Sequence, residues 1–143
     1  MTPRAEGEDG TVLMLVIGFT IVLVVMVGVV VDVSAVVLAK RSVAAAADGA
    51  AVSAAQALDL DALYRDGLRD QLPLDPAEAS SRVAAYEAEA AAAQPGLRLS
   101  VQVDGRTAVV TATRTVPLPF PVPGSPGTVD VQSVARARAP AVP

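Results

Sequence analysis

Residues 11–31 read TVLMLVIGFTIVLVVMVGVVV, 21 residues without a charged side chain. At a rise of about 1.5 Å per residue, an α-helix of this length crosses a hydrocarbon core of roughly 30 Å. The stretch exceeds the ~7 to 15 apolar residues of a secretory signal peptide, and residues 1–10 before it carry three acidic side chains against one arginine. The sequence therefore predicts an uncleaved transmembrane helix over residues 11–31.

Two other interpretations of this stretch stay open. It could be a leader that is cleaved near Val33-Ser34-Ala35 or in the Ala-rich run that follows. It could also be the buried helix of a soluble protein, although a chain of 143 residues has little material to surround 21 apolar residues on every side.

The composition argues against several classes of function. The net charge is −4, and Cys and His are both absent, which removes thiolate and imidazole chemistry and the usual soft metal ligands. The sequence also lacks a dense cluster of Lys and Arg, which would indicate nucleic-acid binding. The carboxylate pairs Asp59/Asp61 and Glu87/Glu89 are two residues apart and face different directions on a helix. We expect no enzyme activity, no cofactor, no metal site, no nucleic-acid partner and no small-molecule substrate.

The helix is predicted to continue past the membrane over residues 32–58. From Ser34 to Leu58 the sequence contains no Pro and is rich in Ala, the best helix former. Asp32, which closes the apolar run, has two interpretations. It could lie inside the edge of the bilayer and face a cation or a neighbouring subunit, or it could be a boundary residue in water.

Small side chains recur at helical spacing along this continuation. Such a stripe permits close approach of another backbone. It could pack against other subunits, or it could seat the chain's own C-terminal domain, and the two uses could be divided between its two ends. The members of the stripe are Val36, Val43, Ala47, Ala50, Ala54 and Leu58.

Residues 59–143 are predicted to form a small α+β domain that begins with two short helices. Asp59-Leu60-Asp61 offers an N-cap for a helix to about Gln71, before Leu72-Pro73. Asp75, followed by Pro76 and by Glu78 three residues after the cap, predicts a second helix from Pro76 to about Gln94.

Three strands are expected after these helices. Alternation of apolar and polar residues over 97–103 and 107–116, on either side of Asp104-Gly105, predicts a hairpin with a type I′ turn. A third strand is predicted around Val129 and Val131, with Arg136 and Arg138 on its polar face. The proline-rich residues 117–127 are expected to form a loop, either a stiff connection or an extended segment that docks a partner.

The anchor region resembles the TadE/TadG-like family of the tight-adherence (Flp) pilus assembly system, in its actinobacterial type. In that pattern a Gly precedes the apolar segment, an Asp closes it, basic residues follow, and an AADxAAL-like run comes next. Here these elements are Gly10, Asp32, Lys40 with Arg41, and Ala46 to Ala51. The resemblance covers residues 8–58 closely.

The resemblance implies a membrane-anchored component of a Flp-type pilus or a related secretion apparatus, acting as minor pilin or assembly accessory by helix packing. It implies a long helix entering a small pilin-like domain, with partners among the other subunits. It also implies a plasma (inner) membrane location, with residues 1–10 cytoplasmic and the C-terminal domain extracytoplasmic. The candidate residues for assembly or packing are Asp32, Lys40, Arg41, Ala47, Asp48 and Ala51.

One position departs from the pilin-like pattern. Pilin-like members of this system are cut after a Gly and carry Glu five residues into the apolar segment, where this chain has Leu15. The departure argues against processing between Gly10 and Thr11, and so favours an accessory role over a minor-pilin role. The alternative to both is a generic anchored module that binds an extracellular ligand.

Overall fold

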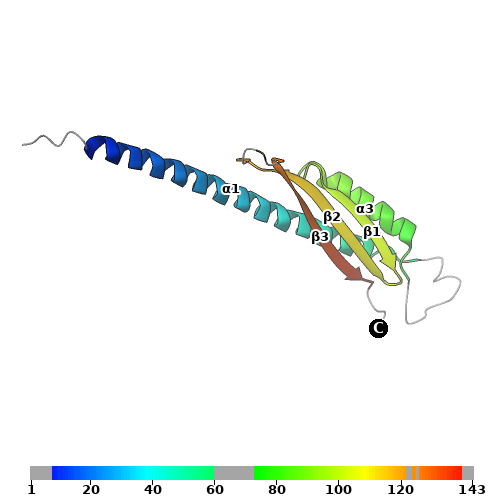
Figure 1. Ribbon diagram of the computed structural model, residues 1–143. Helices are drawn as coiled ribbons and strands as arrows, with labels where there is room; N and C mark the ends of the chain where they lie inside the picture. Colours follow the sequence, from blue (N-terminus) through cyan, green and yellow to red (C-terminus); the bar gives the residue numbers. More distant parts are fainter. Residues whose placement is uncertain (1–7, 60–72, 122–123, 125, 140–143) are drawn as a thin grey trace, which may run out of the picture.

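An unbroken helix, α1 (Glu8–Ala54), forms the long axis of the molecule (Figure 1). This computed structural model describes residues 8–59, 73–121, 124 and 126–139. With 47 residues, α1 is about 70 Å long at a rise of about 1.5 Å per residue. Two hydroxyl groups of the apolar half are satisfied within the helix. Thr20 and Ser34 donate hydrogen bonds to the carbonyl oxygens of Val16 and Val30, at 2.7 and 2.8 Å. The long N-terminal apolar helix predicted from the sequence is confirmed.

Helix α1 ends at Ala54, before the predicted limit at Leu58. The last turn tightens, with the Ala57 nitrogen donating to the Ala54 carbonyl at 3.1 Å. Leu58 then forms an isolated antiparallel bridge with Leu74, and the Asp75 nitrogen donates to the Ala57 carbonyl at 2.9 Å. The chain thus leaves the helix because residues 57–59 pair with residues 73–75, a distant segment that local helix propensity does not report.

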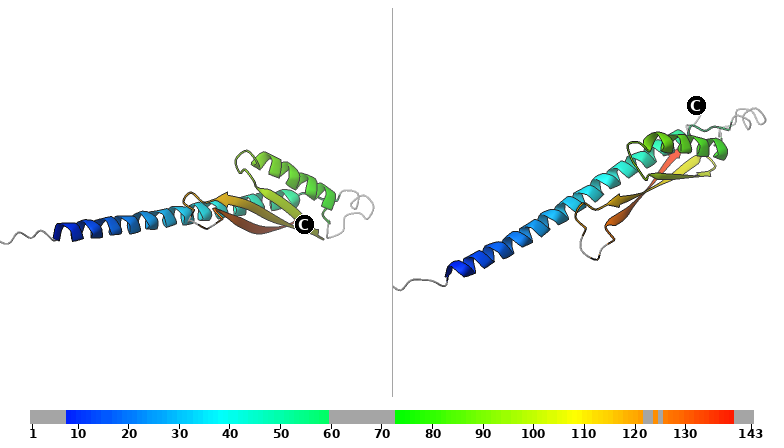
Figure 2. Two further views of the ribbon diagram at one scale, coloured as in Figure 1. Left: turned by 45° about the horizontal axis from the view of Figure 1, so that its top comes forward. Right: turned by 90° about the horizontal axis from the view of Figure 1, so that it is seen from above.

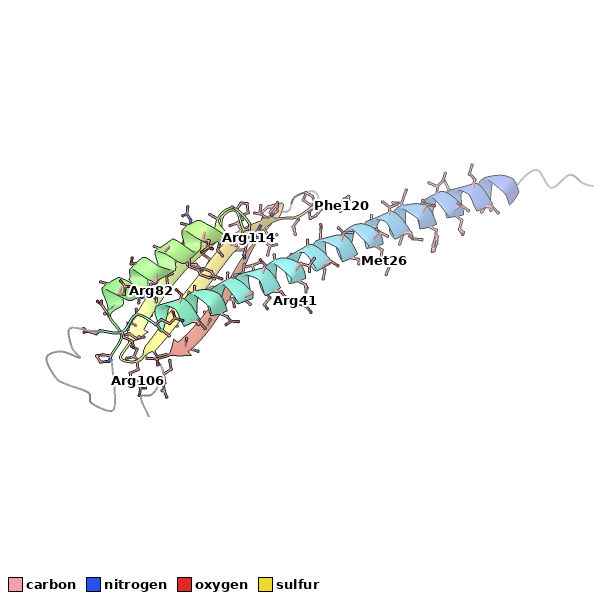
Figure 3. The ribbon with its side chains drawn as sticks, turned by 180° about the vertical axis from the view of Figure 1, so that it is seen from behind. Met26, Arg41, Arg82, Arg106, Arg114 and Phe120 are labelled. Carbon is pink, nitrogen blue, oxygen red and sulfur yellow. The ribbon has the colours of Figure 1, made fainter. Side chains whose placement is uncertain are left out.

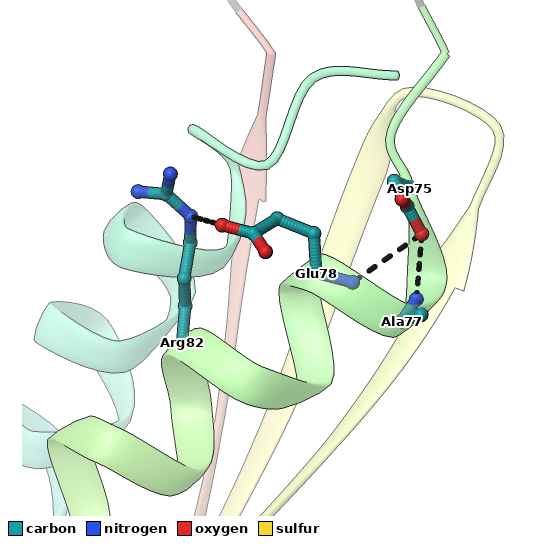
Figure 4. A network of polar contacts seen from close by, with 4 residues as sticks. All are labelled: Asp75, Ala77, Glu78 and Arg82. Atoms are coloured by element: carbon teal, nitrogen blue, oxygen red, sulfur yellow. Dashed lines mark hydrogen bonds and ion pairs between the residues drawn. The ribbon is translucent and has the colours of Figure 1, made fainter. Parts of the chain in front are cut away.

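Helix α3 (Pro76–Ala90) starts as the sequence predicts. The Asp75 carboxylate accepts hydrogen bonds from the backbone nitrogens of Ala77 and Glu78, at 2.8 and 3.3 Å (Figure 4). One turn on, Arg82 contacts Glu78 at 2.8 Å. The helix ends at Ala90 rather than near Gln94, and the other short helix, predicted to start at Asp59 and run to about Gln71, lies almost wholly outside the described residues.

The three predicted strands form one antiparallel sheet, in the order β1 (Arg98–Asp104), β2 (Thr107–Pro117), β3 (Thr128–Arg138). The predicted α+β class with a three-stranded sheet is therefore confirmed. The turn between β1 and β2 differs from the prediction, because Asp104 pairs with Thr107 and the central residues are Gly105 and Arg106. Only Gly105 has a positive φ, +56°, which is the pattern of a type II′ turn with Gly first, rather than type I′.

The C-terminal half of α1 and helix α3 form one layer of the molecule, and the sheet forms the second layer (Figures 1 and 2). Both α1 and α3 contact one face of the sheet, and the views in Figure 2 show them side by side. The core between the layers is built from Ala and Val, and its largest fully buried side chains are Val43 and Val110. Such small side chains let the helix backbone lie close to the sheet.

The antiparallel sheet places the β1–β2 turn and the segment after β2 at its two opposite ends. The β1–β2 turn lies at the end of the sheet that is next to the C-terminal end of α1. At the other end of the sheet, where β2 ends and β3 begins, the strands lie beside the middle of α1 (Figure 1). The strands thereby carry residues 118–121 back toward the apolar half of α1.

Candidate assembly interface

Among the described residues, none covers α1 between Gly10 and Val27. Large apolar side chains are exposed on all sides of the helix from Val12 to Val27, with Met14 at 78%, and exposed apolar side chains continue to Leu38 at 65%. Figure 3 shows this bare segment, with Met26 projecting from it. Within the described residues α1 is the one helix long and apolar enough to cross a membrane. A surface of this kind is suited to lipid, where its backbone groups are all satisfied within the helix.

The C-terminal half of α1 is the seat of the small domain. Val43, Ala47, Ala50 and Ala54 have no exposed surface, and the stripe's end members Val36 and Leu58 are half-buried against the same core. The stripe of small residues therefore packs against the chain's own sheet and α3. Of the candidate assembly residues, Ala47 and Ala51 belong to this core and present no surface to another subunit.

The side of α1 that faces away from this core carries a line of exposed residues at alternating spacings of three and four. We call it the outer strip, and it consists of Leu38, Arg41, Ala45, Asp48 and Val52. Figure 3 shows Arg41 projecting away from α3 and Phe120. Lys40 is exposed as well, but it lies seven residues before Ala47 and so on the core side of the helix, away from the strip. Two candidate assembly residues, Arg41 and Asp48, thus lie on one open helix surface.

Asp32, the remaining candidate, is engaged within the chain. Its Oδ1 atom accepts a hydrogen bond from the backbone nitrogen of Phe120 at 2.9 Å. One turn earlier, a Cβ at Gly28 would meet the Cβ of Phe120 at 3.6 Å. The loop after β2 therefore rests on α1 at residues 28–32, within or at the edge of the predicted membrane segment. Neither interpretation of Asp32 from the sequence included this partner.

Gly10 and Thr11, at the processing site that the sequence disfavours, lie in the first turns of α1. Both are exposed, and a Cβ at Gly10 would have no neighbour within 4 Å. The bond between them is helical rather than extended.

An open groove runs between α3 and β1, lined by Ser80, Val83, Glu87, Leu97 and Leu99 among others. The one acidic side chain that lines this groove, Glu87, already has hydrogen-bond partners within the protein. Glu87 accepts a hydrogen bond from the Leu99 nitrogen at 2.7 Å and contacts Arg98 at 3.4 Å. Among the described residues no group of three or more acidic side chains is placed to hold a metal ion.

Within the described residues one long apolar helix carries a two-layer α+β head at its far end, an arrangement that fits the class of membrane-anchored proteins. Residues 10–57 match the family described as "Putative Flp pilus-assembly TadE/G-like". The match covers α1 from Gly10 and the turn that follows it, and it stops before α3. It confirms the TadE/TadG-like identity of this segment, and the actinobacterial type stays a prediction. Comparisons with curated proteins and with solved structures return no match.

The family match relates the chain to Flp pilus assembly and points to a structural rather than a catalytic role. Together with the bare apolar helix, it supports anchoring in a membrane. Sequence reasoning identified the anchor but missed the contact between Phe120 and α1. The available signal was the position of Phe120 as the only Phe outside the apolar segment, within a run of prolines.

Proposed function

We propose that this protein is a membrane-anchored subunit of a Flp-type pilus assembly or related secretion apparatus, acting as an accessory protein or minor pilin. In this proposal residues 1–10 are cytoplasmic, residues 11–31 cross the plasma membrane, and the α+β head is extracytoplasmic. The outer strip of α1 is the surface that packs against a helix of another subunit.

The main support for the proposal is that residues 10–57, which match the family, have one side of the helix packed in the chain's own core and another side exposed. Its inward side is buried in the chain's own core, whereas its outward side is exposed over the same turns, with Leu38 at 65% and Val52 at 55%. The spacing of three and four along the outer strip is the spacing with which two helices pack along a shared seam. Arg41 and Asp48 on the strip carry opposite charges, which can pair with a neighbouring helix and fix its register.

The alternative, a generic anchored binding module, has weaker support. Binding sites usually offer large aromatic or Arg anchors at a pocket. In the groove between α3 and β1, Glu87 accepts hydrogen bonds from the Arg98 side chain and from the Leu99 backbone N–H. Phe120, the exposed aromatic of the head, lies against α1 instead of in this groove.

Cysteine crosslinking in cells that express the whole apparatus tests the proposal. The natural chain has no Cys, so each variant carries a single thiol. We expect Leu38→Cys and Val52→Cys to form crosslinked species with other subunits. The matched control is Thr113→Cys, because Thr113 is exposed on the sheet face turned away from the helices.

Crosslinks from the two outer-strip positions and none from Thr113 would support packing through α1. Recovery of monomer alone from all three variants, in cells where the apparatus is assembled, would contradict the proposal. Equal crosslinking from all three positions would also contradict the assignment of the outer strip.

A further inference from the structure

We propose that the segment Leu118–Pro121 is a second membrane contact of this protein. It would place Phe120 in the boundary between lipid headgroups and acyl chains, on the side of the bilayer from which α1 emerges, with Asp32 holding it there. The inference rests on α1 crossing a membrane, and it does not depend on any role in pilus assembly.

The first support is the level at which this segment meets α1. Phe120 contacts the helix at Gly28 and Asp32, whereas exposed apolar side chains continue past this level to Val33, Val37 and Leu38. The first cations, Lys40 and Arg41, lie on the order of 10 Å further along the helix axis. The segment thus joins α1 inside its apolar zone and below its charged end.

The length of that apolar zone fits this placement. From Val12 to Leu38 the helix is about 40 Å long. A bilayer has a hydrocarbon core of about 30 Å and measures about 40–45 Å with its interfacial layers. If residues 11–31 fill the core, Val33 to Leu38 lie in the interfacial layer, and Phe120 beside Asp32 lies at its inner edge. Lys40 and Arg41 can then extend toward the phosphate groups.

The second support is that the segment has no backbone donor left unpaired. Pro119 and Pro121 carry no N–H, the Leu118 nitrogen donates to the Gly127 carbonyl at 2.8 Å, and the Phe120 nitrogen donates to Asp32 Oδ1 at 2.9 Å. An unpaired backbone N–H is costly in an apolar environment, because no water is there to accept its hydrogen bond. The prolines and Asp32 remove that cost over this segment.

The third support is Phe120 itself. Its side chain is 59% exposed, and Figure 3 shows it at the edge of the head, next to α1. Phe and Leu are among the apolar side chains that interfacial segments bury at the boundary between headgroups and acyl chains. Lipid is favoured over a protein partner because the apolar surface beside Phe120 continues without a break into the membrane segment of α1.

Tryptophan fluorescence of the full chain in phosphatidylcholine vesicles tests this placement. The natural sequence has no Trp, so Phe120→Trp carries a single reporter. We expect its emission to shift to shorter wavelength in vesicles and to be quenched by lipids brominated near the headgroup. Two further single-Trp variants serve as references: Phe19→Trp reports the middle of the membrane span, and Gln102→Trp reports the exposed face of the sheet.

The proposal predicts quenching of Phe19→Trp by deeply brominated lipid, quenching of Phe120→Trp by shallow bromine, and no quenching of Gln102→Trp. Unquenched Phe120→Trp beside quenched Phe19→Trp would overturn the proposal. In that case access of aqueous iodide to the indole of the Phe120→Trp variant would show that the segment lies in water, and protection from iodide would show that protein, from the same chain or a second copy, covers it. Failure of Phe19→Trp to be quenched would overturn the anchoring itself and, with it, this inference.

A second pair of variants tests the part assigned to Asp32. In the Phe120→Trp background, Asp32→Ala removes the acceptor and is expected to reduce the quenching by shallow bromine. Ser34→Ala, two residues away, loses only a hydrogen bond within α1 and should leave the quenching unchanged. Equal quenching in the Asp32→Ala and Ser34→Ala variants would contradict the role of Asp32. Because the chain has no Cys, a nitroxide at Leu118→Cys, which keeps the backbone N–H that donates to Gly127, gives an independent readout, with greater access to oxygen than to a water-soluble nickel complex expected.

Discussion

Gly49 allows α3 to approach α1 closely. A Cβ at this position would lie 2.9 Å from Cζ of Tyr86 and closer still to the Tyr86 hydroxyl oxygen. By helix propensity alone, Gly49 is a weak point in the long helix. The structure gives it a packing role instead, because any side chain there must displace Tyr86 or the helix that carries it.

We expect Gly49→Ala to destabilise the head by about 1 kcal/mol. Overpacking typically costs about 1–3 kcal/mol, and the better helix propensity of Ala returns up to about 1 kcal/mol. The measurement is thermal unfolding of the full chain in detergent micelles. Gly18→Ala is the matched control, because a Cβ at Gly18 has no neighbour within 4 Å, and it should cost nothing.

Combining Gly49→Ala with Tyr86→Phe should recover part of the loss, since the hydroxyl oxygen is the atom nearest to the new Cβ. An increase in the melting temperature of the single variant Gly49→Ala would contradict this account of the contact between α1 and α3.

At the scale of the elements, Glu87 joins α3 to the edge strand β1. Its carboxylate accepts a hydrogen bond from the Leu99 N–H at 2.7 Å, a backbone donor on a strand that, among the described residues, has a neighbouring strand on one side only. Edge strands with open donors can pair with other chains, and a covering side chain limits this.

Replacing Glu87 with Ala is therefore expected to destabilise the head by about 1 kcal/mol, less than a fully buried charged hydrogen bond, and to increase association of purified protein. Denaturant unfolding and light scattering measure the two effects. Glu87→Gln keeps an acceptor oxygen and should lose less. Glu89→Ala removes the same charge from an exposed position on the same helix and should change neither property. Equal effects of Glu87→Ala and Glu89→Ala would contradict the contact.

The elements themselves followed closely from local sequence signals. The period of two in residues 97–103, the Asp75 cap with Pro76, and the long apolar run of residues 11–31 each act within a few residues, so the helix starts and strand positions were predictable. The features that differed depend on distant partners. Helix α1 ends early because Leu58 pairs with Leu74, and Phe120 reaches Asp32 across 88 positions in the chain. The hairpin turn differed because an Asp-Gly pair does not by itself decide which two residues occupy the centre of the turn.

At the scale of the whole molecule, one helix connects an anchor to a head. The head has a core of Ala and Val between two layers, and small side chains bury little apolar area each. Its seat on α1 is accordingly part of its own core, not an accessory contact. The C-terminal half of α1 and the sheet therefore form one packed unit.

The most direct test of the central claim, a membrane-crossing helix with an extracytoplasmic head, is labelling of single-Cys variants in intact cells with a thiol reagent that does not cross membranes. We predict labelling of Thr113→Cys in intact cells, labelling of Thr2→Cys only after lysis, and no labelling of Val24→Cys before denaturation. Labelling of Val24→Cys in intact cells, or labelling of Thr2→Cys with protection of Thr113→Cys, would contradict the account.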